Sequence, residues 1–219
     1  MHEEVPIKGP EPLGSPVRLT AYVDANYAGN LRTRRSHSGI LIYMNQAPII
    51  WYRKRQNTVE ASSFGSEYIA LRICTGMVEA LHYKLRCFGV PIEGPCDVMC
   101  DNRSFVTNSS VPTSVLNKRH NAICYHRVRE AQAAGVIRVG WIKGKNNIAD
   151  LFTKTTLSNE AKRIFVQNIF DNLARHCLER RFPSRNLLAK ALELVNQVEG
   201  PSSWTCVHKL AGTELVSPW

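Results

Sequence analysis

Four acidic residues, far apart along the chain, have the side-chain type that divalent cations prefer. They are Asp24 in AYVDANYAG, Glu67 in SSFGSEYIAL, Asp101 in VMCDN and Asp150 in NNIADLFTK. Four carboxylates gathered at one end of a sheet repel one another and lose hydration, so their joint presence requires a cation. Hard oxygen ligands suit Mg²⁺ or Mn²⁺, and two such ions about 3.5 to 4 Å apart can hydrolyse a phosphodiester.

Each acid, taken alone, also has an ordinary structural explanation. Asp24 can be a turn residue at the end of a strand, and Glu67 can be a first-turn acid favoured by the helix dipole. Asp101 or its neighbour Asn102 can cap a helix, and Asp150 in a first helical turn needs no metal. The metal-site hypothesis therefore depends on the four acids coming together in space.

Alternating apolar and polar residues predict the strands that would position these acids. Residues 17–24 alternate in this way and end in Asp24. GILIYM and QAPIIWY, residues 39–44 and 46–52, follow as a hairpin, so the first three strands should be adjacent and antiparallel. Residues 98–100 are a short buried strand that delivers Asp101 at its carboxyl end, where ligands collect in open α/β sheets. Residues 136–142 alternate again and give a fifth strand.

Helical periodicity predicts the elements between the strands. Residues 58–90 carry two apolar rows, and Glu67 lies one turn before the second row on the same side. The rows are Ile69, Ile73, Met77, Leu81, Leu85 and Phe88, and Ala70, Leu71, Cys74 and Val78. Glu60 lies two turns earlier and is a second candidate acid. A basic helix is expected over residues 114–135, and a last helix, capped by Asn146 or Asn147, carries Asp150.

The chain is basic, with 28 Lys and Arg against 18 Asp and Glu and a net charge of +10. Residues 1–155 hold 20 basic and 12 acidic side chains, a net charge of +8. Such an excess suits a polyanionic partner, although a solvated basic surface is the alternative. Two basic clusters are expected at strand ends: Arg32, Arg34 and Arg35 after the first strand, and Arg53, Lys54 and Arg55 after the third.

Other sites and locations are disfavoured. The seven cysteines are odd in number and show no paired CxxC spacing, which favours reduced intracellular thiols. His120 and His126 point to different sides of one helix, and His176, Cys177, Cys206 and His208 fit no zinc pattern. The start has no signal or transit pattern, and no run of about 18 apolar residues occurs. We therefore expect an intracellular protein, cytoplasmic or nuclear, with no membrane partner.

Five ordered segments resemble the ribonuclease H domain of copia-type LTR retrotransposon Pol polyproteins. They are YVDANYAGNLRTRRSHSGILIY, IIWYRKRQNTVEASSFGSEYIAL, CDN, KRHNAICYHRVREA and NNIADLFTK, which cover about residues 18–157. The resemblance implies an α/β fold with a five-stranded mixed sheet flanked by helices. It also implies a site that cuts the RNA strand of RNA/DNA hybrids, in which Asp24, Glu67, Asp101 and Asp150 are the catalytic ligands of two Mg²⁺ or Mn²⁺ ions.

The same resemblance implies the partners of the chain. Asn102 and the two arginine-rich clusters are the expected nucleic-acid contacts. The hybrid would be the substrate, the reverse-transcriptase portion of the parent polyprotein a further partner, and a virus-like particle a cytoplasmic location. One departure is the loop KGKNN, residues 143–147, because cellular ribonucleases H carry a mobile histidine there.

Two other functions stay open at this stage. A decayed or domesticated remnant would keep the fold and a nucleic-acid-binding surface without turnover. A DNA transposase or integrase core shares the sheet but uses three acids in another arrangement. For domain organisation we predict an extended lead-in over residues 1–16, a ribonuclease H-like domain over 17–158, a helical extension over 159–200 and a weakly ordered tail over 201–219.

Overall fold

The computed structural model describes residues 14–111, 121–154, 163 and 166–167. The chain divides into two compact units, residues 1–173 and 174–219, and every described residue lies in the first unit. Residues 1–13 of the predicted lead-in, the predicted tail and nearly all of the predicted helical extension lie outside the described residues. In the described part of the chain, no helix is long and apolar enough to cross a membrane.

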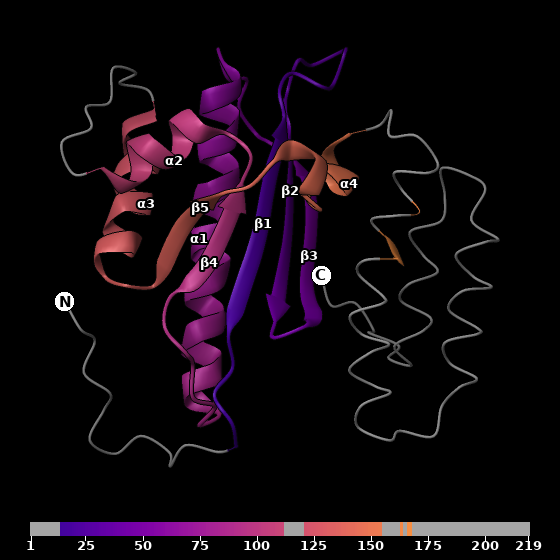
Figure 1. Ribbon diagram of the computed structural model, residues 1–219. Coiled ribbons are helices and arrows are strands. Elements are labelled where there is room, and N and C mark those ends of the chain that lie inside the picture. The colour runs from indigo at the N-terminus through magenta and orange to yellow at the C-terminus, as the bar shows by residue number, and fades with distance from the viewer. Residues whose placement is uncertain (1–13, 112–120, 155–162, 164–165, 168–219) are drawn as a thin grey trace, which may run out of the picture. The chain divides into compact units, whose positions relative to one another are not determined.

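A five-stranded mixed sheet forms the centre of the first unit (Figure 1). Its strands are β1 (Leu19–Asn26), β2 (His37–Met44), β3 (Ala47–Arg55), β4 (Cys96–Cys100) and β5 (Ile137–Trp141), in the order β3-β2-β1-β4-β5. β1, β2 and β3 pair antiparallel, whereas β4 runs parallel to both β1 and β5. The predicted mixed sheet with three antiparallel leading strands is confirmed.

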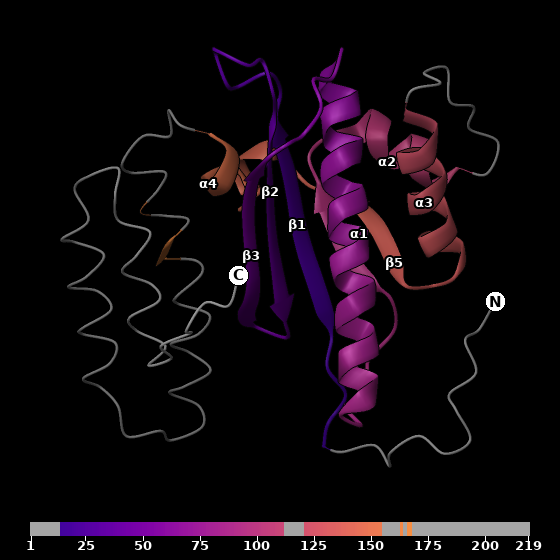
Figure 2. The same ribbon diagram turned by 180° about the vertical axis from the view of Figure 1, so that it is seen from behind.

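Alternate residues of the sheet pack on two different layers. Ile40 and Ile42 of β2 belong to the main core under the long helix α1 (Ser63–Cys87), whereas Leu41 and Tyr43 pack with Phe152 on the opposite face. Phe152 belongs to the short helix α4 (Asp150–Thr153), and α1 lies across the other face of the sheet (Figure 2). The period of two along β2 therefore explains why α1 and α4 lie on opposite faces.

The long helix α1 begins where the side chain of Ser62 caps it, with Ser62 Oγ accepting from the Gly65 N–H at 3.3 Å. Its second predicted row, Ala70, Leu71, Cys74 and Val78, is completely buried. The first row is mostly half-buried, and Phe88 is 70% exposed because the helix ends at Cys87. Glu60 precedes the helix. Glu67 is its fifth residue, so the explanation of Glu67 as a first-turn acid is wrong.

An aromatic cluster joins α1 to two shorter helices, α2 (Arg103–Ser110) and α3 (Ala122–Ala133). Tyr68 of α1 packs against Phe105 of α2 and Tyr125 of α3, with ring centroids 4.3 and 5.9 Å apart. Both Tyr68 and Phe105 are almost completely buried. This packing fixes the start of α2, which begins two residues after Asp101. The predicted helix over residues 114–135 is seen from Ala122 onward, and its residues 114–120 lie outside the described part.

Arg53, Lys54 and Arg55 were expected after the third strand, and that boundary is wrong. All three lie within β3, paired with Gly39, Ser38 and His37 of β2. The reason is that ladder hydrogen bonds to β2 continue past the apolar stretch, and an exposed strand edge tolerates long basic side chains.

Gly39 of β2 allows α4 to lie close against the sheet. A Cβ added at Gly39 would lie 2.7 Å from Thr153 Cγ2 and 2.9 Å from the Ala149 carbonyl oxygen. Both contacts are shorter than van der Waals separation, so a larger residue must push α4 away from β2.

We therefore expect Gly39→Ala to lower the free energy of unfolding by about 1 to 3 kcal/mol, the usual cost of overpacking. Gly76→Ala is the matched control, because a Cβ there has nothing within 4 Å and a helical alanine stabilises by roughly 0.5 to 1 kcal/mol. Urea unfolding of both variants checks the pair. A Gly39→Ala protein as stable as the original would contradict this account of the α4 contact.

Asp97, near the start of β4, links this strand to Arg18, which precedes β1, and to Arg138 of β5. Its carboxylate accepts from Arg18 Nη2 at 2.6 Å and from Arg138 Nε at 2.7 Å, and the residue is 6% exposed. Burial by itself would raise the pKa of this carboxyl, but the hydrogen bonds from Arg18 and Arg138 outweigh it and lower the pKa below 3.8. The native state therefore favours the ionised form.

A carboxyl whose pKa is lowered by folding stabilises the protein above its unfolded pKa, and the stabilisation is lost as the pH falls through its folded pKa. We expect Asp97→Asn to lower the free energy of unfolding at pH 7 by about 1 to 3 kcal/mol. The difference from the original protein should shrink below about pH 4. Chemical unfolding at pH 7, 4 and 3 measures it, and a difference that stays constant with pH would contradict the role of the ion pairs.

Candidate metal centre

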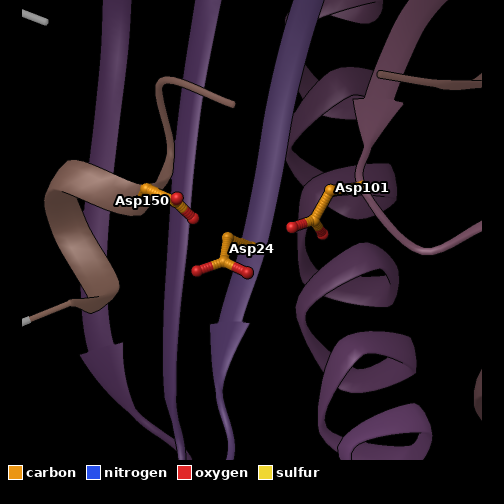
Figure 3. A group of neighbouring side chains, drawn as sticks. All are labelled: Asp24, Asp101 and Asp150. Atoms are coloured by element: carbon orange, nitrogen blue, oxygen red, sulfur yellow. The ribbon is translucent and has the colours of Figure 1, made fainter. Parts of the chain in front are cut away.

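Three of the four predicted acids meet at one end of the sheet (Figure 3). Asp24 lies near the carboxyl end of β1, Asp101 directly follows β4, and Asp150 is the first residue of α4. One carboxylate oxygen from each lies within 4.8 Å of the others. The parallel pairing of β1 and β4 brings Asp24 and Asp101 together, and α4 adds Asp150 from a segment more than 40 residues further along the chain.

Asp24 is held in place by the helix that lies over it. The Thr153 hydroxyl of α4 donates to Asp24 Oδ2, and both residues are buried. Burial, with the nearby charge of Asp150, raises the pKa of Asp24, although the Thr153 hydrogen bond and Lys154 act in the opposite direction. The Asp24 carboxylate is therefore held in one orientation, but its surroundings still disfavour the ionised form.

Asp101 is free of the capping role that was its alternative explanation. Asn102 is the N-cap of α2, and its Oδ1 accepts from the Phe105 N–H at 3.3 Å. The indole of Trp141, at the end of β5, donates to the Asp101 carbonyl oxygen at 3.1 Å. Burial, followed by the charge of Asp24, raises the pKa of Asp101. The residue is thus fixed through its backbone, and its carboxylate points to the other acids.

Asp150 combines one paired carboxylate oxygen with one that is buried and unsatisfied. It is 3% exposed, and its Oδ1 is buried with no hydrogen-bond partner among the described residues. Its Oδ2 forms an ion pair with Lys154, four residues later. A buried oxygen of this kind costs about 1 to 3 kcal/mol, more when charged, and burial accordingly raises the pKa of Asp150. A cation at this point would remove that cost.

The turn before α4 is tied to β1 by Asn147. Its Nδ2 donates to the Val23 carbonyl at 3.0 Å, and its Oδ1 accepts from the Ala149 N–H at 3.2 Å. The predicted capping of this helix by Asn146 or Asn147 is wrong in detail, because Ala149 is the N-cap and has no side-chain cap bond. Asn147 instead fixes the position from which Asp150 reaches Asp24.

Glu67 lies beside this group rather than within it. The Asn102 side chain forms a hydrogen bond to Glu67, whose Oε2 is buried and has no partner among the described residues. Burial raises the pKa of Glu67 to about 7; Asp101 and Asp24 add to the rise, and Asn102 opposes it. Glu67 is thus close enough for the charges of Asp101 and Asp24 to affect its pKa, but it does not contribute one of the three converging carboxylate oxygens.

The two basic clusters lie at the same end of the sheet as the aspartates. The loop with Arg32, Arg34 and Arg35 follows β1, and Arg53–Arg55 end β3, a strand that runs parallel to β1 across β2. Five of these six residues are exposed, and Arg35 is half-buried. The acidic group is therefore bordered by positive charge, and the nucleic-acid contacts of these residues stay a prediction.

Sequence reasoning missed three residues that shape this centre: Gly39, Thr153 and Lys154. Thr153 and Lys154 follow Asp150 by three and four residues, which places them on its side of a helix. That spacing was a usable signal. Gly39 gave none, because its importance comes from the tertiary approach of α4 to β2.

The three aspartates fit a divalent cation. All donors are carboxylate oxygens, the ligands of Mg²⁺ and Mn²⁺. Two ligands on opposite sides of an ion at about 2.1 to 2.4 Å are about 4.2 to 4.8 Å apart, and the three carboxylate oxygens lie within 4.8 Å of one another, close enough to share one ion. The unpartnered Asp150 Oδ1 supplies the electrostatic reason for binding.

Comparison with known proteins points to transposon polyproteins. The chain is 29% identical over 160 residues to the retrovirus-related Pol polyprotein from transposon RE1 of Arabidopsis thaliana, a match that covers 71% of this chain. It is also 29% identical over 147 residues, 67% of this chain, to the corresponding polyprotein from transposon TNT 1-94 of Nicotiana tabacum. Each match spans only 11% of the polyprotein. No protein-family model matches the chain.

The fold matches solved ribonuclease H structures. LC11-RNase H1, solved in complex with an RNA/DNA hybrid, aligns with a TM-score of 0.50 and 16% sequence identity, covering 68% of this chain and 99% of that one. At such low identity the likeness shows the fold alone. The chain is therefore similar in sequence to one segment of the retrovirus-related Pol polyproteins of plant transposons, and it has the ribonuclease H fold.

Proposed function

We propose that this chain is a metal-dependent endonuclease that hydrolyses the RNA strand of RNA/DNA hybrids during the reverse transcription of a retrotransposon. The observation that carries the proposal is the convergence of Asp24, Asp101 and Asp150 within 4.8 Å, with a buried oxygen of Asp150 left without a partner. The homology to Pol polyproteins and the likeness to LC11-RNase H1, which was solved with such a hybrid, support it.

The residues have separate roles in this proposal. Asp24, Asp101 and Asp150 would hold the metal, and Glu67 is beside them as the fourth acid. Two Mg²⁺ or Mn²⁺ ions would supply an activated water and stabilise the leaving oxygen. Thr153 fixes the rotamer of Asp24, and Asn102 restrains Glu67 while capping α2. The basic residues of the β1–β2 loop and of β3 would hold the phosphate backbone over the aspartates.

A binding module without turnover is the second candidate. The observation that favours it is the loop 143–147, which has no histidine and so lacks the mobile group that cellular ribonucleases H carry there. Both candidate functions predict that the chain binds an RNA/DNA hybrid, and only the nuclease predicts that the chain cleaves it.

Asp101→Asn should abolish cleavage of a labelled RNA/DNA hybrid in Mg²⁺ or Mn²⁺, with a loss of at least about 100-fold. The reason is that a ligand of the catalytic metal contributes several kcal/mol to transition-state stabilisation, and each 1.36 kcal/mol is tenfold in rate. Glu130→Gln, which removes an exposed acid on α3, is the control and should cleave normally. If the original protein and Asp101→Asn both bind the hybrid but neither cuts it, the binding module is the correct function.

The raised pKa of Glu67 predicts a pH-dependent stability for the metal-free protein. A carboxyl whose pKa rises from 4.5 to about 7 on folding contributes stability that is present below pH 4.5 and lost as the pH rises through about 7. Glu67→Gln should therefore match the original protein near pH 5 and exceed it at pH 8 by about 1 to 3 kcal/mol.

Urea unfolding in EDTA at pH 5 and pH 8 measures this difference. Added Mg²⁺ should narrow it, because a nearby cation favours the ionised carboxylate. A Glu67→Gln protein less stable than the original at pH 8 would show that the carboxylate is satisfied in the folded state.

A further inference from the structure

Lys154 is the only basic side chain in the described part of the chain that forms an ion pair with one of the three clustered aspartates. Its ammonium pairs with Asp150 Oδ2, and the Asp150 carboxylate is almost completely buried. The charge of Lys154 also opposes the rise in pKa that burial causes at Asp24 and Asp101. One ammonium thus acts on all three acids.

The backbone explains why Lys154 reaches the cluster. Lys154 is the C-cap of α4, its N–H donates to the Asp150 carbonyl oxygen at 2.9 Å, and the two residues are four positions apart. That spacing places their side chains on the same side of the helix. Because α4 is held against β2 and β1 by Gly39 and Asn147, the lysine is carried to the acidic group together with Asp150.

The lysine can also leave the cluster at low cost. Its side chain is 47% exposed, and its flexible stem allows the ammonium to return to water. Thr153, by contrast, is 1% exposed and is enclosed by the contact of α4 with β2. The two residues that neutralise or orient the acids therefore differ: Thr153 is a fixed partner of Asp24, and Lys154 is an exchangeable partner of Asp150.

A divalent cation and Lys154 compete for the same carboxylate. A divalent cation held by Asp24, Asp101 and Asp150 would neutralise the same negative charge that the Lys154 ammonium offsets in its absence. The divalent cation and the ammonium would also repel each other. Any group that stabilises the metal-free state in preference to the metal-bound state weakens metal binding by the same free energy.

We propose that Lys154 is the internal counter-cation of this centre: its ammonium holds Asp150 in the metal-free protein, yields that carboxylate when a divalent cation binds, and so sets the metal affinity of the site. The inference rests on the metal site of the proposed function. Lys154 is a positioning residue in this role, because it acts on the metal through Asp150.

The test compares Lys154→Gln with Lys145→Gln, which removes the same charge from the exposed loop before α4. Mn²⁺ affinity is measured by titration calorimetry without nucleic acid, and thermal unfolding is measured in EDTA. We expect Lys154→Gln to bind Mn²⁺ about tenfold more tightly and to unfold at a lower temperature in EDTA. Lys145→Gln should change the affinity by less than about twofold, and Lys154→Arg should resemble the original protein.

The outcomes separate the inference from the function on which it rests. If the original protein binds Mn²⁺ and Lys154→Gln binds it equally or more weakly, the counter-cation role is overturned and the metal centre stands. If the original protein binds neither Mn²⁺ nor Mg²⁺ at millimolar concentrations, the metal centre fails and the inference fails with it. An unchanged unfolding temperature in EDTA would also overturn the role, since Lys154 would then contribute nothing to the metal-free state.

Discussion

The repulsion among three largely buried carboxylates is the constraint on which this end of the molecule depends. Holding one oxygen of each within 4.8 Å raises the free energy of the folded state, and burial raises the pKa of all three. The surrounding structure opposes that repulsion with rigid attachments: a central pair of parallel strands, the close contact at Gly39 and the bonds of Asn147. Such preorganisation is what a metal centre requires, because the ligands do not have to be assembled when the ion arrives.

The acids at the two ends of β4 show how the aspartate cluster differs from an ordinary ion pair. Asp97 lies on this short strand and is buried, and Asp101 directly follows the strand and is half-buried. Hydrogen bonds from two arginines lower the pKa of Asp97, whereas burial and the charge of Asp24 raise the pKa of Asp101. Ion-pair networks that serve stability lower the energy of the charged form, whereas an arrangement that raises it requires a function to explain it. The contrast within one strand therefore favours a metal role for Asp101.

The sequence was informative where the chemistry follows local periodicity. Alternation placed Asp24 on a strand, and the short apolar run placed Asp101 at the carboxyl end of another, so their meeting followed from parallel pairing. Glu67 was harder, because its helix brings it beside the aspartates while Asn102 holds it. The importance of Gly39 and the true role of Asn147, which local patterns indicated only as a helix cap, could not be predicted in this way, since both arise from contacts with segments more than 100 residues away. Tertiary contacts, which local patterns do not encode, complete the site.

The charges around the site give the proposed nuclease a coherent electrostatic design. Exposed arginines at the end of β3 and in the β1–β2 loop would attract a phosphate backbone, but that backbone brings more negative charge to a group of acids that already repel one another. The single ammonium of Lys154 pairs with Asp150 and offsets only part of the charge of the three acids, and a bound polyanion would add to the charge that remains. Substrate and divalent cations would then bind cooperatively, because each reduces the electrostatic cost of the other. The exposed stem of Lys154 matters for this reason: a counter-ion that could not withdraw would stabilise the empty site at the expense of the loaded one.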